Sequence, residues 1–205
     1  RRADRVRLIR YAVMQPYTCI VADPPWNEAG GGKIKRGADQ HYPLIKSRAG
    51  ILRAMVQAPV WNPAKNAHLW MWATNNHLPD ALWLIDALDF KYKTNFPWVK
   101  SGPMGIGQYA RGCHEMLLFA VRGSGYAARC SKPELPGKFT WARTDALVNI
   151  ARPRYPAGHE KAGKTIHSAK PQEAYDLISR LSQGPRLDMF ARKDRPGFDV
   201  WGNEV

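Results

Sequence analysis

The residues best suited to chemistry lie in the stretch I-V-A-D-P-P-W at positions 20–26, where an acid, two prolines and a tryptophan follow a short apolar run. The carboxylate of Asp23 can accept hydrogen bonds. We expect the carbonyl of Pro24 to be left free, because Pro25 has no N–H and cannot continue a strand ladder. The indole of Trp26 adds a flat face on which a ring can stack.

Two acceptors and one aromatic face suit a planar ring that carries an exocyclic amine. The acceptors would hold both amine hydrogens and draw the nitrogen lone pair out of conjugation, so that the amine becomes a usable nucleophile. The alternative is a rigid strand-to-loop corner with a buried tryptophan, which needs no ligand. The motif alone leaves this alternative open, although four residues in this order are far more particular than a lone glycine-rich loop.

The hydrophobic pattern indicates which elements position this motif. Short apolar runs typical of buried strands occur at residues 19–22, 68–73, 115–121 and 187–191, and another strand should end near 97–100. Apolar residues at helical spacing predict helices after a capping Ser47, through residues 82–90 and through residues 174–181. Four tryptophans in or beside these elements are expected in the core, namely Trp70, Trp72, Trp83 and Trp98.

Apolar strands that alternate with amphipathic helices predict an α/β fold with a mostly parallel central sheet, buried under helices on both faces. Ligands of such sheets bind beyond the carboxyl ends of the strands. Asp23, Asn75 and Arg192 each follow a predicted strand, which places the opening motif in that crevice. We expect a single domain over residues 1–205, with a mobile loop at 27–43.

The charge balance favours a polyanionic partner. Lys and Arg number 31 against 17 Asp and Glu, a formal net charge of +14 with pI ≈ 10.0. Such an excess attracts phosphates, and the alternative is a basic surface that only keeps the protein soluble. Residues 122–165 are rich in Gly, Pro and basic residues, so we expect a loop-rich segment that faces nucleic acid.

Cysteine and histidine indicate no metal site. Cys19, Cys113 and Cys130 are far apart and show neither zinc-ligand nor disulfide-framework spacing, and Cys19 fits a small core residue. No apolar run approaches the roughly 20 residues of a membrane span. We expect a cytoplasmic protein in a reducing compartment, with no metal and no membrane partner.

Several stretches beyond the opening motif carry a resemblance to one family. D-P-P-W at 23–26 resembles the catalytic motif of amino-methyltransferases that modify adenine N6, and the wider pattern is similar to the MT-A70 family. The matching stretches are H-L-W-M-W-A-T-N at 68–75, P-W-V-K-S at 97–101, R-G-C-H-E-M-L-L-F-A-V-R-G at 111–123, H-S-A-K-P at 167–171, L-D-M-F-A-R at 187–192 and W-G-N-E at 201–204.

The resemblance implies a Rossmann-like methyltransferase fold and methyl transfer from S-adenosyl-L-methionine to adenine N6, with a role for each matching residue. The catalytic residues would be Asp23, Pro24, Pro25 and Trp26. The cofactor would be bound by Asp23, Ser168, Lys170, Arg192, Asn203 and Glu204. The substrate would be contacted by Tyr42, Lys100, Arg111 and His114. Apart from the resemblance, the Gly-rich loop with Lys33, Lys35 and Arg36 is expected to contact the substrate as a lid that orders on binding nucleic acid.

Simpler structural interpretations stay open for several of these residues. Lys170 could be a solvated residue before a helix, and Arg192 could pair with Asp188 or Asp194 on the surface. His114 and Glu115 open an apolar strand and fit a structural role as well as substrate contact. The sequence also has no G-x-G-x-x-G phosphate fingerprint, which a cofactor without phosphate does not need.

The compact length, the absence of appended RNA-binding modules and the strong basicity lead us to expect DNA as the substrate, as in small stand-alone bacterial or phage enzymes. RNA is the alternative polymer within the same chemistry. A catalytically silent nucleic-acid-binding subunit is the alternative outside it, and the intact set of Asp23 to Trp26, Lys170 and Arg192 counts against that. A homodimer or a heteromeric partner is left open.

Overall fold

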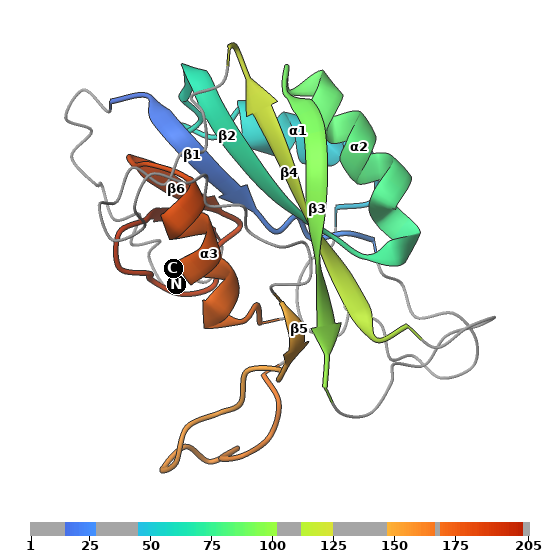
Figure 1. Cartoon of the computed structure of the whole chain (residues 1–205), viewed down its shortest axis with the longest axis vertical. Helices are drawn as coiled ribbons and strands as arrows, with labels where there is room; N and C mark the ends of the chain where they lie inside the picture. The colour runs from blue at the N-terminus through green and yellow to red at the C-terminus, as the bar shows by residue number, and fades with distance from the viewer. Residues whose placement is uncertain (1–14, 28–44, 102–111, 125–146, 167–168, 203–205) are drawn as a thin grey trace, which may run out of the picture.

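The computed structural model describes residues 15–27, 45–101, 112–124, 147–166 and 169–202. The elements follow the chain in the order β1 (Tyr17–Ala22), α1 (Arg48–Val56), β2 (Pro63–Ala73), η2 (Asn75–His77), α2 (Leu78–Ala87), β3 (Lys91–Lys100), β4 (His114–Arg122), β5 (Val148–Ile150), α3 (Gln172–Leu181), β6 (Arg186–Met189) and β7 (Asp199–Trp201). Strands and helices alternate from β1 to β3, and α3 separates β5 from β6, as expected of an α/β fold (Figure 1).

The strands form a seven-stranded sheet in the order β5-β3-β4-β2-β1-β6-β7. Strand β1 pairs in parallel with both β2 and β6, and the pairs β3–β5 and β6–β7 are parallel as well. Strand β4 alone runs antiparallel, between β2 and β3. The mostly parallel sheet is therefore confirmed, and β5 and β7 are short strands that the hydrophobic pattern did not predict.

Helices cover both faces of the sheet, as predicted (Figure 1). Helices α1 and α2 pack on one face, where their buried residues join those of alternate strand positions such as Ile20 and Leu69. Helix α3 packs on the other face with Cys19, Val21 and Trp70. Because successive strand side chains point to opposite faces, each buried strand supplies both layers. This explains why the strands read as continuous apolar runs.

Two of the predicted helices, α1 and α3, begin where the sequence signals place them. The side chain of Ser47 accepts the backbone N–H of Gly50 and caps α1, as the sequence predicts. Helix α3 buries Ala174, Leu177 and Ile178 on one face, and it follows Pro171, whose fixed backbone angle suits a helix start. Within the described ranges, no helix has the length and apolar composition to cross a membrane.

Most of the predicted core is confirmed. Trp70, Trp72 and Trp98 are almost completely buried, and Cys19 is fully buried. The prediction is wrong for Trp83, which lies on the outer side of α2 with 36% of its surface exposed. The guanidinium of Arg48 covers its ring at 4.6 Å, so a cation–π contact takes the place of core packing.

Candidate active site

The opening motif lies at the carboxyl end of β1, at the point where the chain connections leave in opposite directions. From β1 the chain passes through α1 to β2 on one side, while β6 follows α3 and lies on the other side. Such a switch point is where ligands bind in open α/β sheets. The structure therefore places Asp23 at the edge that the sequence predicted.

The corner formed by the two prolines is a tight turn. The backbone N–H of Trp26 donates to the carbonyl of Pro24 at 2.8 Å, across Pro25. Because proline holds φ near −65°, the middle residue suits this three-residue turn. The expectation that the Pro24 carbonyl is free is wrong. A carbonyl oxygen has two lone pairs, however, so one accepting position of Pro24 is used and the oxygen can still accept a second bond.

Trp26 is also a packing residue. Its side chain is buried, its indole N–H donates to the carbonyl of Trp72 at 3.0 Å, and its ring stacks on His77 at 5.3 Å between centroids. These contacts fasten the end of β1 to the end of β2. The corner is thus rigid and its tryptophan is buried, and the bordering of a base by Trp26 stays a prediction.

Four charged side chains gather next to this corner, and we call them the edge cluster: Asp23, Lys100, Glu115 and Lys170. The ammonium of Lys170 lies 3.0 Å from Oδ1 of Asp23 and 3.1 Å from Oε2 of Glu115. Lys100 pairs with the other carboxylate oxygen of Glu115. Each of the four side chains is at most 16% exposed, so the cluster is largely withdrawn from water.

The direction of β4 brings Glu115 into the edge cluster. Glu115 is the second residue of β4 and lies opposite Trp98 of β3. Since β4 is antiparallel to its neighbours, its first residues meet the carboxyl ends of the others. From the sequence alone, Glu115 fits a structural role as well as substrate contact, and nothing predicts a pairing with Lys170. An acid at the start of an otherwise apolar strand is the signal that could have found it, had the strand direction been known.

Lys170 is not a solvated residue before a helix, because its side chain is only 7% exposed. Burial alone would lower its pKa, but Asp23 and Glu115 outweigh that and hold the pKa of Lys170 above its ordinary value. Its ammonium also lies 5.4 Å from the centre of the Trp72 ring. A buried cation so firmly held keeps its charge at any physiological pH.

The two lysines determine the ionisation of Glu115. Burial would raise the pKa of this carboxyl, but the ammonium groups of Lys170 and Lys100 lower it to about 2. The carboxylate of Glu115 therefore fixes both lysines across the edge of the sheet. The ammonium of Lys100 also lies 4.7 Å from the ring centre of Trp98. Lys100 therefore contacts Trp98 of β3 and Glu115 of β4.

A second buried ion pair lies at the end of β6. Asp188 is 2% exposed and accepts a hydrogen bond from Nε of Arg195 at 3.1 Å. The guanidinium of Arg195 also covers the ring of Tyr175 at 3.4 Å. The structural interpretation of Arg192 named Asp188 or Asp194 as a surface partner; Asp188 is instead buried and pairs with Arg195.

The backbone turn that follows β6 leads directly into Arg192. Phe190 adopts a left-handed backbone with φ of 61°, and the N–H of Ala191 donates to the carbonyl of Trp201 at 3.0 Å. A Cβ on Gly202 would lie 2.1 Å from the carbonyl oxygen of Ala191, so this close approach requires glycine. Arg192 itself is partly buried at this turn.

The remaining predicted site residues divide into two groups. His114 is exposed at the start of β4, beside the edge cluster in sequence but without a described role. The others lie outside the described residues, namely Lys33, Lys35, Arg36, Tyr42, Arg111, Ser168, Asn203 and Glu204. The N–H of Ile45 donates to the carbonyl of Pro25 at 3.2 Å, so the chain re-enters the described region at the corner itself.

The described residues hold no group of three or more His, Cys, Asp or Glu side chains that could bind a metal ion. Glu115 and Asp23 are instead neutralised by lysine. The chemistry of the edge cluster is therefore that of ion pairs and hydrogen-bond acceptors around the end of β1.

A mostly parallel, doubly covered sheet with a charged site at its switch point defines a Rossmann-like α/β protein. Comparison with known proteins makes this more specific. Residues 17–204 match the MT-A70 family, and the chain belongs to that family of methyltransferases. It is also similar to the type II methyltransferase M.MunI of Mycoplasma sp, with 25% identity over 211 residues that cover 92% of this chain and 78% of the relative.

Proposed function

We propose that the protein transfers the methyl group of S-adenosyl-L-methionine to the exocyclic N6 amine of adenine in DNA. The observation that carries the proposal is the position of Asp23. It lies at the carboxyl end of β1, next to the carbonyl of Pro24 and 3.0 Å from the buried Lys170, in a chain of the MT-A70 family. Asp23 can accept a hydrogen bond from the adenine amine, and the pair of Asp23 and Lys170 can bind the ammonium and carboxylate of the cofactor's methionine part.

The acceptors at the corner suit a planar amine. A carboxylate can accept about four hydrogen bonds, so the ion pair with Lys170 leaves Asp23 with accepting capacity. The second lone pair of the Pro24 carbonyl provides the other acceptor, since the turn uses only one. Together they would hold the two amine hydrogens and stabilise the positive charge that develops on N6 during the transfer.

The edge cluster also fits the cofactor. The methionine part of S-adenosyl-L-methionine carries an ammonium and a carboxylate close together, and Asp23 and Lys170 are an acid and a cation 3.0 Å apart. When bound, the cofactor supplies an electrophilic methyl group on a sulfonium. Lys170 would hold the carboxylate, and Asp23 would orient the ammonium as well as the target amine.

Glu115 and Lys100 would act through Lys170. Glu115 is shared by the two lysines, so its carboxylate fixes the ammonium of Lys170 at the end of β1. An ammonium on a flexible four-carbon chain would otherwise lose entropy on binding a ligand. We assign Glu115 as a positioning residue, with Lys100 as its second support.

Two observations favour a nucleic acid, and DNA in particular. The net charge of +14 favours a phosphate-rich partner. The similarity to a type II methyltransferase favours DNA over RNA. An adenine in a duplex is stacked, so the base must leave the helix, or the enzyme must take single strands, before N6 can reach the corner.

The test is methyl transfer from labelled S-adenosyl-L-methionine to matched DNA and RNA oligonucleotides, with the product nucleosides resolved. We expect N6-methyladenine in DNA from the wild type. Asp23→Asn should lower the rate by about 10²–10³-fold, as does the loss of one stabilising group at a reacting centre. The matched control is Asp86→Asn, which changes an exposed acid on α2 and should keep the wild-type rate.

The other outcomes separate the alternatives. Transfer mainly to RNA would replace DNA with RNA as the substrate and would leave the proposed methylation of adenine N6 unchanged. A methyl mark on an atom other than N6 would reject the assigned role of the corner. Failure of the wild type to bind the cofactor and to methylate either polymer would replace the proposal with a catalytically silent subunit.

A further inference from the structure

Residues 151–166, between β5 and α3, form a segment that we call the finger. It leaves the edge of the sheet after β5 and extends away from the body of the molecule as a long loop (Figure 1, orange). None of its residues is buried. A segment without a buried core gains nothing from the hydrophobic effect, so its ordered shape needs another source.

Hydrogen bonds within the finger supply that shape. A bridge pairs Arg154 with Thr165, and the N–H of Tyr155 donates to the carbonyl of Lys164 at 2.9 Å. The guanidinium of Arg154 donates to the carbonyl of Gly163 at 2.8 Å. Tyr155 and His159 stack with their ring centres 4.4 Å apart. The finger is therefore a defined hairpin-like structure, held by its own contacts.

The finger is strongly basic. Its basic residues are Arg152, Arg154, Lys161 and Lys164, and its sole acid is Glu160. Glu160 pairs with Lys161 at 3.7 Å, and both side chains are more than half exposed. Exposed pairs of this kind are worth little and are screened by salt, so the pairing does not cancel the attraction for phosphates.

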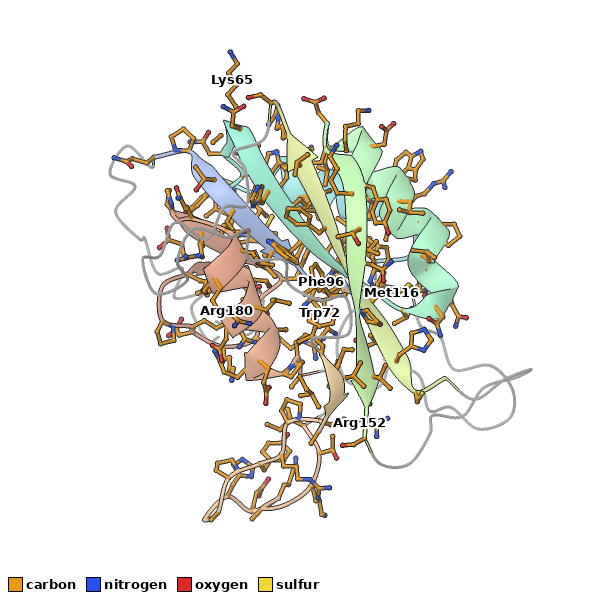
Figure 2. The ribbon with its side chains drawn as sticks, in the orientation of Figure 1. Lys65, Trp72, Phe96, Met116, Arg152 and Arg180 are labelled. Atoms are coloured by element: carbon orange, nitrogen blue, oxygen red, sulfur yellow. The ribbon has the colours of Figure 1, made fainter. Side chains whose placement is uncertain are left out.

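Both ends of the finger lie close to the edge cluster. Upstream, Ile150 of β5 lies opposite Lys100 of β3, the partner of Glu115. Downstream, Lys170 follows four residues after the finger ends. Figure 2 shows Arg152 at the base of the finger, while Lys65 lies at the opposite end of the molecule. A polymer with a base at Asp23 would thus have its flanking nucleotides on the side of the finger.

From this placement we propose that the finger binds the phosphate backbone of the nucleic acid next to the target base, with Lys161 and Lys164 as phosphate contacts. The proposal rests on the proposed function, because it takes nucleic acid as the substrate. Backbone contacts of this kind position a polymer without reading its sequence. The stacked Tyr155 and His159 would keep the lysines in place against the backbone.

The test measures binding of a fluorescent duplex of about 30 base pairs by anisotropy over a range of salt concentrations. The double variant Lys161→Gln/Lys164→Gln should weaken binding roughly tenfold, and the slope of log K against log salt should fall by about 1.8, for two lost phosphate contacts. The charge-retaining variant Lys161→Arg/Lys164→Arg should bind as the wild type does.

A matched control separates local contact from total charge. Lys65→Gln/Lys93→Gln removes the same charge from exposed residues of β2 and β3, with Lys65 at the far end from the finger. It should leave the affinity and the salt slope near their wild-type values. Equal losses in both double variants would mean that only net charge matters, and an unchanged finger variant would also overturn the proposal. So would a finger variant that loses an acidic protein partner while keeping its affinity for DNA.

Failure of the finger and failure of the proposed function give different results. If the wild type methylates DNA and the finger variant binds it normally, the function stands and the finger proposal falls. If no methyl transfer occurs but the finger variant still loses affinity and salt slope, the finger stands and the methylation proposal falls. A wild type that binds no nucleic acid would overturn both.

Discussion

Glu115 and Asp188 are two buried carboxylates at the same edge of the sheet, and their pKa values move in opposite directions. Burial would raise both. Two ammonium groups, from Lys170 and Lys100, lower the pKa of Glu115 to about 2. Arg195 opposes the effect of burial on Asp188 only in part, so the pKa of Asp188 rises to about 6. At this edge, the number of cations per carboxylate decides which effect wins.

The difference has a consequence for the site. A carboxylate that stays ionised can hold Lys170 in place at any physiological pH, which suits a positioning role for Glu115. The pKa of Asp188, about 6, lies close to physiological pH. Asp188 pairs with Arg195, whose guanidinium covers Tyr175, and this arrangement suits a packing role next to the turn that leads to Arg192. Substitution of Lys170 removes one of the two cations that hold Glu115, and substitution of each carboxylate tests its pKa directly.

Lys170→Met should have the largest effect. It leaves Asp23 without its lysine partner and Glu115 with Lys100 alone, and breaking a buried ion pair in this way costs about 3–5 kcal/mol of unfolding free energy. We also expect methyl transfer to fall by about a hundredfold or more, since the amine and the cofactor lose their orientation. Urea unfolding and a methylation assay provide the two measurements.

The matched control for this variant is Lys65→Met, an exposed lysine of β2, which should stay within about 0.5 kcal/mol of the wild type. A Lys170→Met protein as stable as the wild type would show that the edge cluster contributes no net stability. In that case the rate of methyl transfer alone would report on the role of Lys170.

Glu115→Gln should change the response to acid. The folded pKa of Glu115, about 2, lies below its ordinary value of 4.5, so its contribution is complete above pH 4.5 and is lost as pH falls toward 2. Its size is about 3 kcal/mol. Unfolding free energies at pH 6, 4 and 3 should therefore show the variant and the wild type converging as pH falls. A constant difference would contradict the low pKa.

Asp188→Asn should show the opposite trend over a higher range. The folded pKa of Asp188, about 6, lies above its ordinary value of 3.8, so the charged form is disfavoured in the fold. The wild type should therefore lose up to about 3 kcal/mol, relative to the variant, as pH rises from about 4 to about 6. The same unfolding series tests this, and a difference that does not vary with pH would reject it.

Lys91→Gln should have the smallest effect. Lys91 pairs with Asp86 at 2.8 Å, a shorter distance than any ion pair of Lys170, but both side chains are at least 70% exposed. Solvent screening makes such pairs weak. We expect an unchanged melting temperature, and a clear drop would show that distance rather than burial decides the value of an ion pair here.

Much of the fold could be predicted from the sequence because its strands and helices have strong local signals. The apolar run before Asp23, the cap at Ser47 and the helical spacing through Leu177 all correspond to observed elements. Strand β7 was missed because its three residues, D-V-W, are too short for a periodic pattern. The outward position of Trp83 was missed because large aromatic residues are usually buried.

The site was predicted in part. Asp23 and Lys170 could be singled out by motif and resemblance, and the structure brings these two together at 3.0 Å. The contact of Lys100 with the same cluster needed the pairing of β3 with β4. The free carbonyl expected at Pro24 was wrong, because absence of a donor at Pro25 does not prevent the next residue from donating across the turn.

Residue types and their spacing are enough to predict the alternation of strands and helices, the acid at the end of the first strand and the basic character of the chain. The direction of β4, and with it the place of Glu115 beside Lys170, follows from the pairing of strands in the folded sheet. An apolar strand buried on both faces reads the same in either direction, so its partners alone set which end meets the site.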